Sequence, residues 1–175
     1  MIDQTLRRIT LGFVAVFMLV FSAAGVVVAQ SESLSNEMLD TIRARCSSSQ
    51  FALQQIEKRD AVSRINRGRA YDQMLRQLSA FNSRFAYNKI SSPDLIQYTT
   101  ELQDAIDAFR TSYDRYDTDI TNALKVNCKE KPSEYYAVIL KAREDRNTVG
   151  AQVSKIEELT AKYREAIVKY DEGLK

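Results

Sequence analysis

The chain has 175 residues, and its 25 basic and 23 acidic side chains give a formal net charge of +2, so no strong positive field favours nucleic acid as a partner. It contains no histidine, which excludes Ser/His/Asp and Cys/His catalysis and removes the commonest metal ligand. Its five glycines stand singly, so there is no glycine-rich phosphate-binding loop, and we expect neither an enzyme nor a cofactor or metal.

The first 29 residues have the pattern of an export segment. Arg7 and Arg8 precede an uncharged apolar run, Leu11–Val28. Val27 and Ala29 supply the small side chains before Gln30. A positive start, an apolar core and small residues before a cleavage point are the three parts of a signal peptide. We therefore expect residues 30–175 to form an extracytoplasmic domain.

Whether the export segment is removed depends on its length. Signal-peptide cores have about 7–15 apolar residues, whereas about 18 can stay in the bilayer as a helix, and Leu11–Val28 lies at this border. The polar residues that follow Ala29 favour cleavage there and a secreted domain. The alternative is a single-pass anchor, in which residues 11–29 contact the membrane and the C-terminal domain lies outside.

Two prolines divide the remaining sequence into three segments. Pro93 follows Ser92 and precedes Asp94, an order typical of a helix start, with a capping hydroxyl, a proline in the first turn and an acid near the positive end of the helix dipole. Pro132 marks a second start. The sequence therefore predicts an all-α fold with helices at about 33–89, 93–127 and 133–174.

Residues of the second and third segments recur at alternating spacings of three and four, as coiled-coil seams require. The seam of the second segment is Leu95, Thr99, Leu102, Ile106, Phe109, Tyr113, Tyr116, Ile120 and Ala123. The seam of the third is Ile139, Ala142, Arg146, Val149, Val153, Ile156, Thr160, Tyr163, Ile167, Tyr170 and Leu174. Because short connections make successive helices antiparallel, we predict an up-down-up three-helix, coiled-coil-like bundle, in which the poorly patterned residues 57–69 bend or fray.

The two cysteines, Cys46 and Cys128, are interpreted as a disulfide, because exported domains fold in oxidising compartments. In an antiparallel bundle Cys46 lies about two helical turns beyond the level of Cys128, a gap that the chain ends can close. The bridge would close a loop of about 80 residues and contribute about 4 kcal/mol in the chain-entropy model. Two buried free thiols and an intermolecular bridge are the alternatives.

The same alignment brings charged residues from all three helices to the middle of the bundle, with Asp60 a turn or two away. The residues of this predicted ionic layer are Arg64, Arg67, Asp114, Asp117 and Arg146. They either set the register of the helices through salt bridges or bind a small anion. The wider basic run of the first helix, which adds Lys58, Arg59, Arg69 and Arg76, could touch anionic polymers or lipid headgroups, but we expect nearby acids to neutralise much of its charge.

Aromatic residues gather near the first turn and the end of the third helix, and most of them are expected in the core. If several were exposed together, the tip formed by Phe85, Tyr87, Lys89 and Ile90 would become a protein-binding surface, because Tyr and Phe are favoured at interfaces.

The leading hypothesis is an exported structural or protein-interaction bundle at the cell envelope, without catalysis. Its partner would be an unknown envelope or extracellular protein, or a second copy of the chain, since seams can be shared between chains. The alternative is an extracytoplasmic ligand-binding or sensory domain that recognises a small anion through the layer around Arg146. Helical folds host many functions, so fold class alone does not choose between the two.

Overall fold

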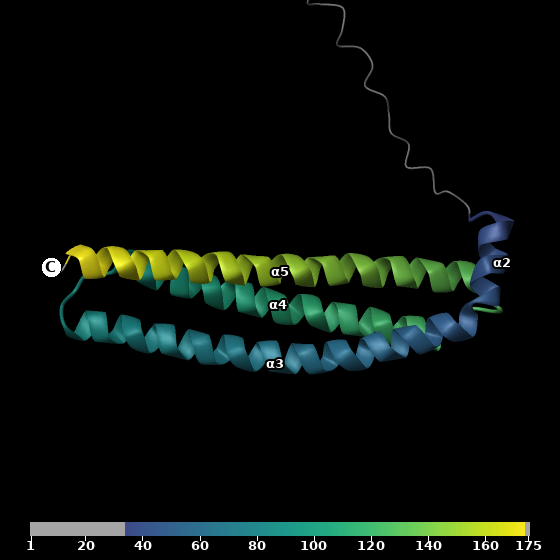
Figure 1. Ribbon diagram of the computed structural model, residues 1–175, viewed down its shortest axis with the longest axis horizontal. Helices are drawn as coiled ribbons and strands as arrows, with labels where there is room; N and C mark the ends of the chain where they lie inside the picture. Colours follow the sequence, from purple (N-terminus) through teal and green to yellow (C-terminus); the bar gives the residue numbers. More distant parts are fainter. Residues whose placement is uncertain (1–33, 174–175) are drawn as a thin grey trace, which may run out of the picture. The chain divides into compact units, whose positions relative to one another are not determined.

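The computed structural model describes residues 34–173, which form four α-helices and no β-strand (Figure 1). The helices are α2 (Asn36–Ala44), α3 (Cys46–Tyr87), α4 (Pro93–Lys125) and α5 (Pro132–Gly173). The predicted all-α fold is confirmed for this part of the chain. The predicted export segment, residues 1–29, lies outside the described residues, and between residues 34 and 173 no helix is long and apolar enough to cross a membrane.

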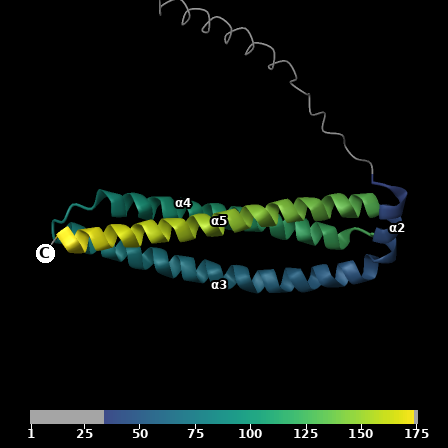
Figure 2. The same ribbon diagram turned by 45° about the horizontal axis from the view of Figure 1, so that its top comes forward.

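The three long helices lie side by side. Figures 1 and 2 show that α4 runs back along α3 and that α5 runs back along α4. The short helix α2 lies across the end at which α3 and α5 begin, in contact with both. α5 packs more closely on α4 than α3 does. The looser contact of α3 leaves shallow cavities along its inner face.

Both prolines begin helices, as predicted. Pro93 and Pro132 are the first residues of α4 and α5, and Asp94 lies in the first turn of α4. The prediction that the Ser92 hydroxyl caps α4 is wrong, because this side chain makes no hydrogen bond to the first turn of the helix. The backbone of Ser92 (φ −140°, ψ 58°) differs from the extended conformation in which serine usually caps a helix.

The first predicted helix, 33–89, is divided, but not where its weak pattern suggested. Residues 57–69 are helical throughout, so the expected fraying there is not observed, and α3 curves gently along its length without a break (Figure 1). The break lies at Arg45 (φ −96°, ψ 8°), between α2 and α3. The Ser48 hydroxyl donates a hydrogen bond of 2.9 Å to the Arg45 carbonyl, and such local bonds compete with regular helix geometry.

The core is centred on α4. Its predicted seam is buried at every position except Thr99, whose hydroxyl donates to the Leu95 carbonyl at 2.8 Å. In contrast, α3 buries only Cys46 and Leu53 fully, and its other inner side chains, such as Met74, are half-buried. α4 is therefore the helix on which α3 and α5 assemble.

The buried faces of α4 and α5 are wider than the predicted seams. Ala105, Ser112 and Asp119 of α4 are also buried, as are Leu159 and Ala166 of α5. A helix that packs against two neighbours buries three or four residues in every two turns, whereas a strict coiled-coil seam buries two. The extra buried residues follow from this geometry.

A substitution at Leu102, whose side chain is fully buried, tests whether the core is centred on α4. Leu102→Ala is expected to lower the free energy of unfolding by about 2–5 kcal/mol, through lost apolar burial and the cavity left behind. Ile96→Ala, a matched change at a side chain that is 55% exposed on the same helix, should cost less than about 0.5 kcal/mol. Chemical denaturation measures both values, and equally small effects would contradict a core centred on α4.

Candidate functional site

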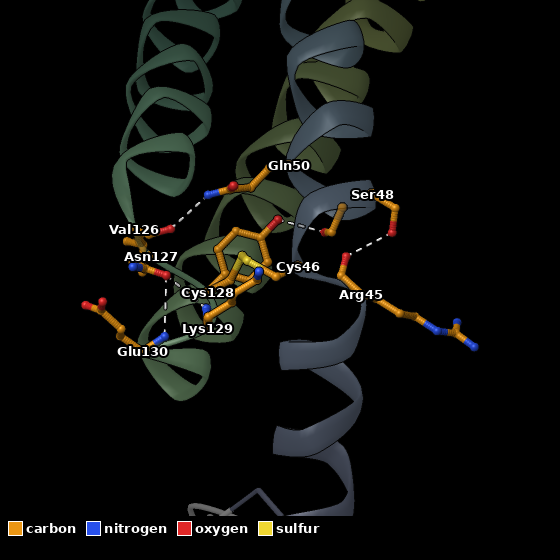
Figure 3. The surroundings of a disulfide bond; sticks show 11 residues. Arg45, Cys46, Ser48, Gln50, Val126, Asn127, Cys128, Lys129 and Glu130 are labelled. Atoms are coloured by element: carbon orange, nitrogen blue, oxygen red, sulfur yellow. Dashed lines mark hydrogen bonds between the residues drawn. A yellow bond between two sulfur atoms is a disulfide. The ribbon is translucent and has the colours of Figure 1, made fainter.

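The predicted disulfide joins the start of α3 to the turn after α4 (Figure 3). The Cα atoms of Cys46 and Cys128 lie 5.5 Å apart, within the range that a disulfide spans. Both cysteines are buried beside Tyr135 of α5. The chain beyond Lys125 turns back toward α3, which closes the gap expected from the helix alignment.

Polar contacts reinforce this end of the bundle (Figure 3). The hydroxyl oxygens of Ser49 and Tyr135 lie 2.7 Å apart, which links α3 to α5. Gln50 donates from Nε2 to the Val126 carbonyl at 3.1 Å, which links α3 to the chain that leaves α4. The disulfide therefore lies inside a region where three helices are already joined.

The charged residues predicted for the middle of the bundle lie there, but their pairing differs from the expected one. Arg146 of α5 contacts Asp60 of α3, with 3.3 Å between Nη2 and Oδ2. Tyr116 of α4 donates its phenolic proton to the same Oδ2 at 2.6 Å. Asp114 pairs at 3.0 Å with Arg64 and not with Arg146. Asp60 is thus a residue through which all three long helices are joined.

The other two predicted members of the layer, Arg67 and Asp117, make no ion pair with any residue between 34 and 173. The two pairs that do form are largely accessible, since the side chains of Arg146 and Asp114 are more than half exposed. Pairs of this kind contribute about 0–1 kcal/mol each. The layer therefore does more to position its side chains than to stabilise the fold.

A cavity of about 320 Å³ opens beside Arg146, between α3 and α5, with α4 as its floor. Its polar lining comprises Asp60, Ser63, Arg67, Tyr113, Tyr116 and Arg146, and its apolar lining comprises Phe109, Val149 and Val153. The cavity thus collects cationic, hydroxyl and apolar side chains from three helices. This combination is typical of sites for small organic ligands.

Tyr113 is the most unusual side chain in this cavity. It is 5% exposed, and its hydroxyl has no hydrogen-bond partner among the residues that the structure describes. Burial, with the nearby Asp60 carboxylate, raises the pKa of Tyr113 to about 12, so the phenol stays protonated at neutral pH. The Arg64 guanidinium lies 5.4 Å from the centre of the ring, in a cation–π arrangement. Tyr113 therefore offers a buried, unused hydrogen-bond donor.

A second cavity of about 280 Å³ lies on the other side of Arg146, and it shares Tyr116 and Arg146 with the first. Its lining is mostly apolar: Ala52, Leu53, Ile56, Ile120, Ile139 and Ala142, with Ser49 and Arg143 also contributing. The contact between Arg146 and Asp60 therefore lies between a polar and an apolar cavity.

Of the four residues of the predicted tip, two are half-buried and two are exposed. Phe85 packs edge-on against Tyr170 of α5, with 5.6 Å between ring centres, and Ile90 is half-buried. Tyr87 is 87% exposed, and Lys89 is exposed in a left-handed conformation (φ 58°) that ends α3. Of the two aromatic residues of this tip, Tyr87 is exposed and Phe85 is not, so the condition of several exposed aromatic residues is not met.

Sequence reasoning missed a polar contact at the far end of the bundle. Tyr163 of α5 donates to Asn82 Oδ1 at 2.6 Å, and Asn82 donates from Nδ2 to Thr99 Oγ1 at 2.7 Å. This chain of bonds joins α5, α3 and α4. The sequence held a clue, since Asn82 follows Leu78 by four residues and therefore lies on the inner face of α3.

A second missed contact lies between α4 and α5, where Lys141 reaches Asp119 at 2.5 Å and Asp145 at 3.5 Å. Burial opposes ionisation of Asp119, but its bonds to Asp145 and Lys141 hold its pKa below the ordinary value. The bond with Asp119, together with burial, raises the pKa of Asp145. Between residues 34 and 173 no group of Cys, Asp and Glu side chains converges in a way that could hold a metal ion.

Comparison with known proteins does not add a functional assignment. No protein-family model, no curated protein and no solved structure matches this chain. The function therefore has to be argued from the chain's own geometry.

Removal of the disulfide tests its contribution to stability. Cys46→Ala/Cys128→Ala is expected to lower the free energy of unfolding by about 2–4 kcal/mol, because the bridge spans 82 residues and restricts the unfolded chain. Denaturation with and without a reducing agent measures the effect. The reducing agent should destabilise the wild-type protein to a similar extent and leave the double variant unchanged. Wild-type stability that did not respond to reduction would contradict this role.

The raised pKa of Tyr113 predicts a loss of stability at high pH. An unfolded tyrosine loses its proton at about pH 10, whereas folded Tyr113 holds it to about pH 12. As the pH rises, ionisation therefore stabilises the unfolded state before the folded one. The stabilising contribution is therefore complete below about pH 10 and is lost between about pH 10 and pH 12.

Near-ultraviolet absorbance of ionised phenol measures this titration. The difference in absorbance between wild type and Tyr113→Phe should show the ionisation of one phenol, centred near pH 12 under native conditions. In denaturant this ionisation should be centred at about pH 10. A difference centred at pH 10 under native conditions would show that Tyr113 is not buried.

Proposed function

We propose that this protein is an exported three-helix, coiled-coil-like bundle that acts as a structural or interaction module at the cell envelope, by binding and without catalysis. Export is supported by the N-terminal sequence pattern and by the buried disulfide, since such bonds persist in oxidising compartments. The single observation that carries the binding role is the outward face of α3, which combines uncompensated basic side chains with exposed apolar ones.

The acidic residues of α3 all face the other helices. Asp60 contacts Tyr116 and Arg146, Asp72 pairs with Arg110 of α4, and Glu57 accepts from the Thr121 hydroxyl at 3.4 Å. These three are the only acids between Cys46 and Tyr87, a stretch that also contains seven basic residues. Of the acids expected to neutralise the basic run, Asp114 pairs with Arg64, but Asp60 and Asp72 are directed toward the other helices, so much of the charge of the run is left uncompensated.

A narrow stripe of side chains runs along the outside of α3. At 100° per residue, its members fall within an arc of about 60° and extend over about 50 Å. Its apolar members, all exposed, are Phe51, Val62, Ile65 and Tyr87, and its basic members are Lys58, Arg69 and Arg76. None of these three basic residues forms an ion pair with residues 34–173, and no acid lies in the arc.

The occupant that best fits this stripe is an anionic membrane surface. Basic side chains attract anionic headgroups, and apolar side chains between them can enter the boundary between headgroups and acyl chains. A straight row along one side of a long helix suits a flat partner. The apolar run Leu11–Val28, if it is retained after export, would also hold the bundle close to the bilayer.

Vesicle binding tests this proposal, with the predicted mature form, residues 30–175. We expect binding to vesicles of equal parts phosphatidylglycerol and phosphatidylcholine, weakening as salt rises, and none to phosphatidylcholine alone. Lys58→Gln/Arg69→Gln/Arg76→Gln should weaken binding about a hundredfold, because each basic residue contributes about 1 kcal/mol at an anionic surface.

The matched control is Arg115→Gln/Arg143→Gln/Arg164→Gln, which removes the same charge from α4 and α5 and should weaken binding only a few-fold. Equal losses in the two triple variants would show that net charge, and not this face of α3, drives binding. Binding to a soluble acidic polymer without binding to anionic vesicles would reject the membrane in favour of an anionic envelope polymer.

A further inference from the structure

The cavity beside Arg146 holds a cation that has no partner. Arg67 lines the cavity and makes no ion pair with any residue between 34 and 173. The other cation, Arg146, already contacts Asp60, and Tyr116 also donates to that carboxylate. Two guanidinium groups and one carboxylate therefore leave the lining with one uncompensated positive charge.

The same cavity holds a hydrogen-bond donor without an acceptor. The Tyr113 hydroxyl is buried and makes no bond within the described part of the chain. Buried donors in folded proteins are nearly always paired, since an unpaired one carries the full cost of its desolvation. Tyr113 and Arg67 both line this space, and a phenolic O–H and a guanidinium are a pair of donors suited to a carboxylate. The Tyr113 hydroxyl is itself covered in the structure, so it has to move toward the cavity to meet a ligand.

The remaining wall of the cavity is apolar and has room. Phe109 of α4 and Val149 and Val153 of α5 contribute apolar side chains. Gly150 also lines the cavity, and a Cβ atom added there would meet nothing within 4 Å. Since a water molecule occupies about 30 Å³ in the liquid, a volume of about 320 Å³ accommodates on the order of ten non-hydrogen atoms.

We propose that this cavity binds a small organic monocarboxylate with an apolar body. Its carboxylate accepts hydrogen bonds from the Arg67 guanidinium and from the Tyr113 hydroxyl, which a small movement of the tyrosine ring uncovers on binding, and its body rests on Phe109, Val149 and Val153. A single negative charge matches the single uncompensated cation. A second negative charge would face the Asp60 carboxylate and be repelled.

This site is separate from the outward stripe of α3 and does not depend on the proposed membrane contact. Arg67 lies about 160° around α3 from Phe51 and Arg69, on the inner face of the helix. Because the cavity is lined by α3, α4 and α5, a bound carboxylate would join the loosely packed α3 to the other two helices. Ligand binding would therefore stabilise the bundle.

The test uses the oxidised full-length chain in neutral detergent, with benzoate and isovalerate as probes. Both anions should raise the melting temperature, because a ligand that binds only the folded state stabilises it. Benzamide, which has the shape of benzoate without its charge, and inorganic phosphate, which has charge without an apolar body, should not. Calorimetric titration then gives the affinity for benzoate.

Three variants separate the parts of the site. Tyr113→Phe removes only the hydroxyl and Arg67→Gln removes only the cation, and each should weaken benzoate binding at least tenfold. Arg69→Gln, at a basic residue on the outward stripe of α3, should leave the affinity unchanged. Gly150→Leu should fill the cavity and abolish binding while the helical circular dichroism spectrum is retained.

Several outcomes would overturn the proposal. They are the absence of binding by either carboxylate, equal binding of benzamide and benzoate, equal binding of phosphate and benzoate, and unchanged affinity in folded Tyr113→Phe or Arg67→Gln protein. None of these results bears on vesicle binding through the stripe of α3, so the failure of one proposal is distinguishable from the failure of the other.

Discussion

The bundle depends on the burial of α4 on two sides. One row of its side chains packs under α3 and another under α5, and residues such as Ile106 and Phe109 lie in the core that all three helices share. Apolar burial is the dominant favourable term in folding, and α4 supplies more buried apolar side chains than any other helix of the described chain. α3 packs more loosely, since it buries few side chains fully and makes fewer contacts with α4 than α5 does.

The looser packing of α3 leaves a cavity with polar side chains in the middle of the bundle. Asp60 contacts both Tyr116 and Arg146, so one carboxylate joins three helices. It also forms an ion pair with one of the two cations in the adjacent cavity. Within the described chain Arg67 then lacks an ion-pair partner, and the buried Tyr113 hydroxyl beside the same cavity has no acceptor. Specific donors in a partly open space suit recognition better than stability, because such peripheral ion pairs add little to the free energy of folding.

Local rules predicted much of the fold. Pro132 and the spacing of apolar residues predicted helix starts and seams, and the pairing of Cys46 followed from helix alignment and redox compartment. What could not be predicted depends on neighbours that are distant in sequence. Leu159 is buried because α5 touches two helices, and Arg45 interrupts a helix beside a cross-linked residue. The unused hydroxyl of Tyr113 was hidden for the same reason, since a seam position shows burial but not which partners are absent.

The position of the disulfide has a mechanical consequence. The described chain enters at Leu34, and only α2 and Arg45 separate this point from Cys46. A pulling force applied at Leu34 would unravel α2 and then meet the covalent bridge, which transfers the load to the turn between α4 and α5. Because the bridge ties the start of α3 to the chain that leaves α4, the force would not peel α3 away from α4 one turn at a time. A bundle held by its N-terminal end would in this way resist extension while its disulfide is intact.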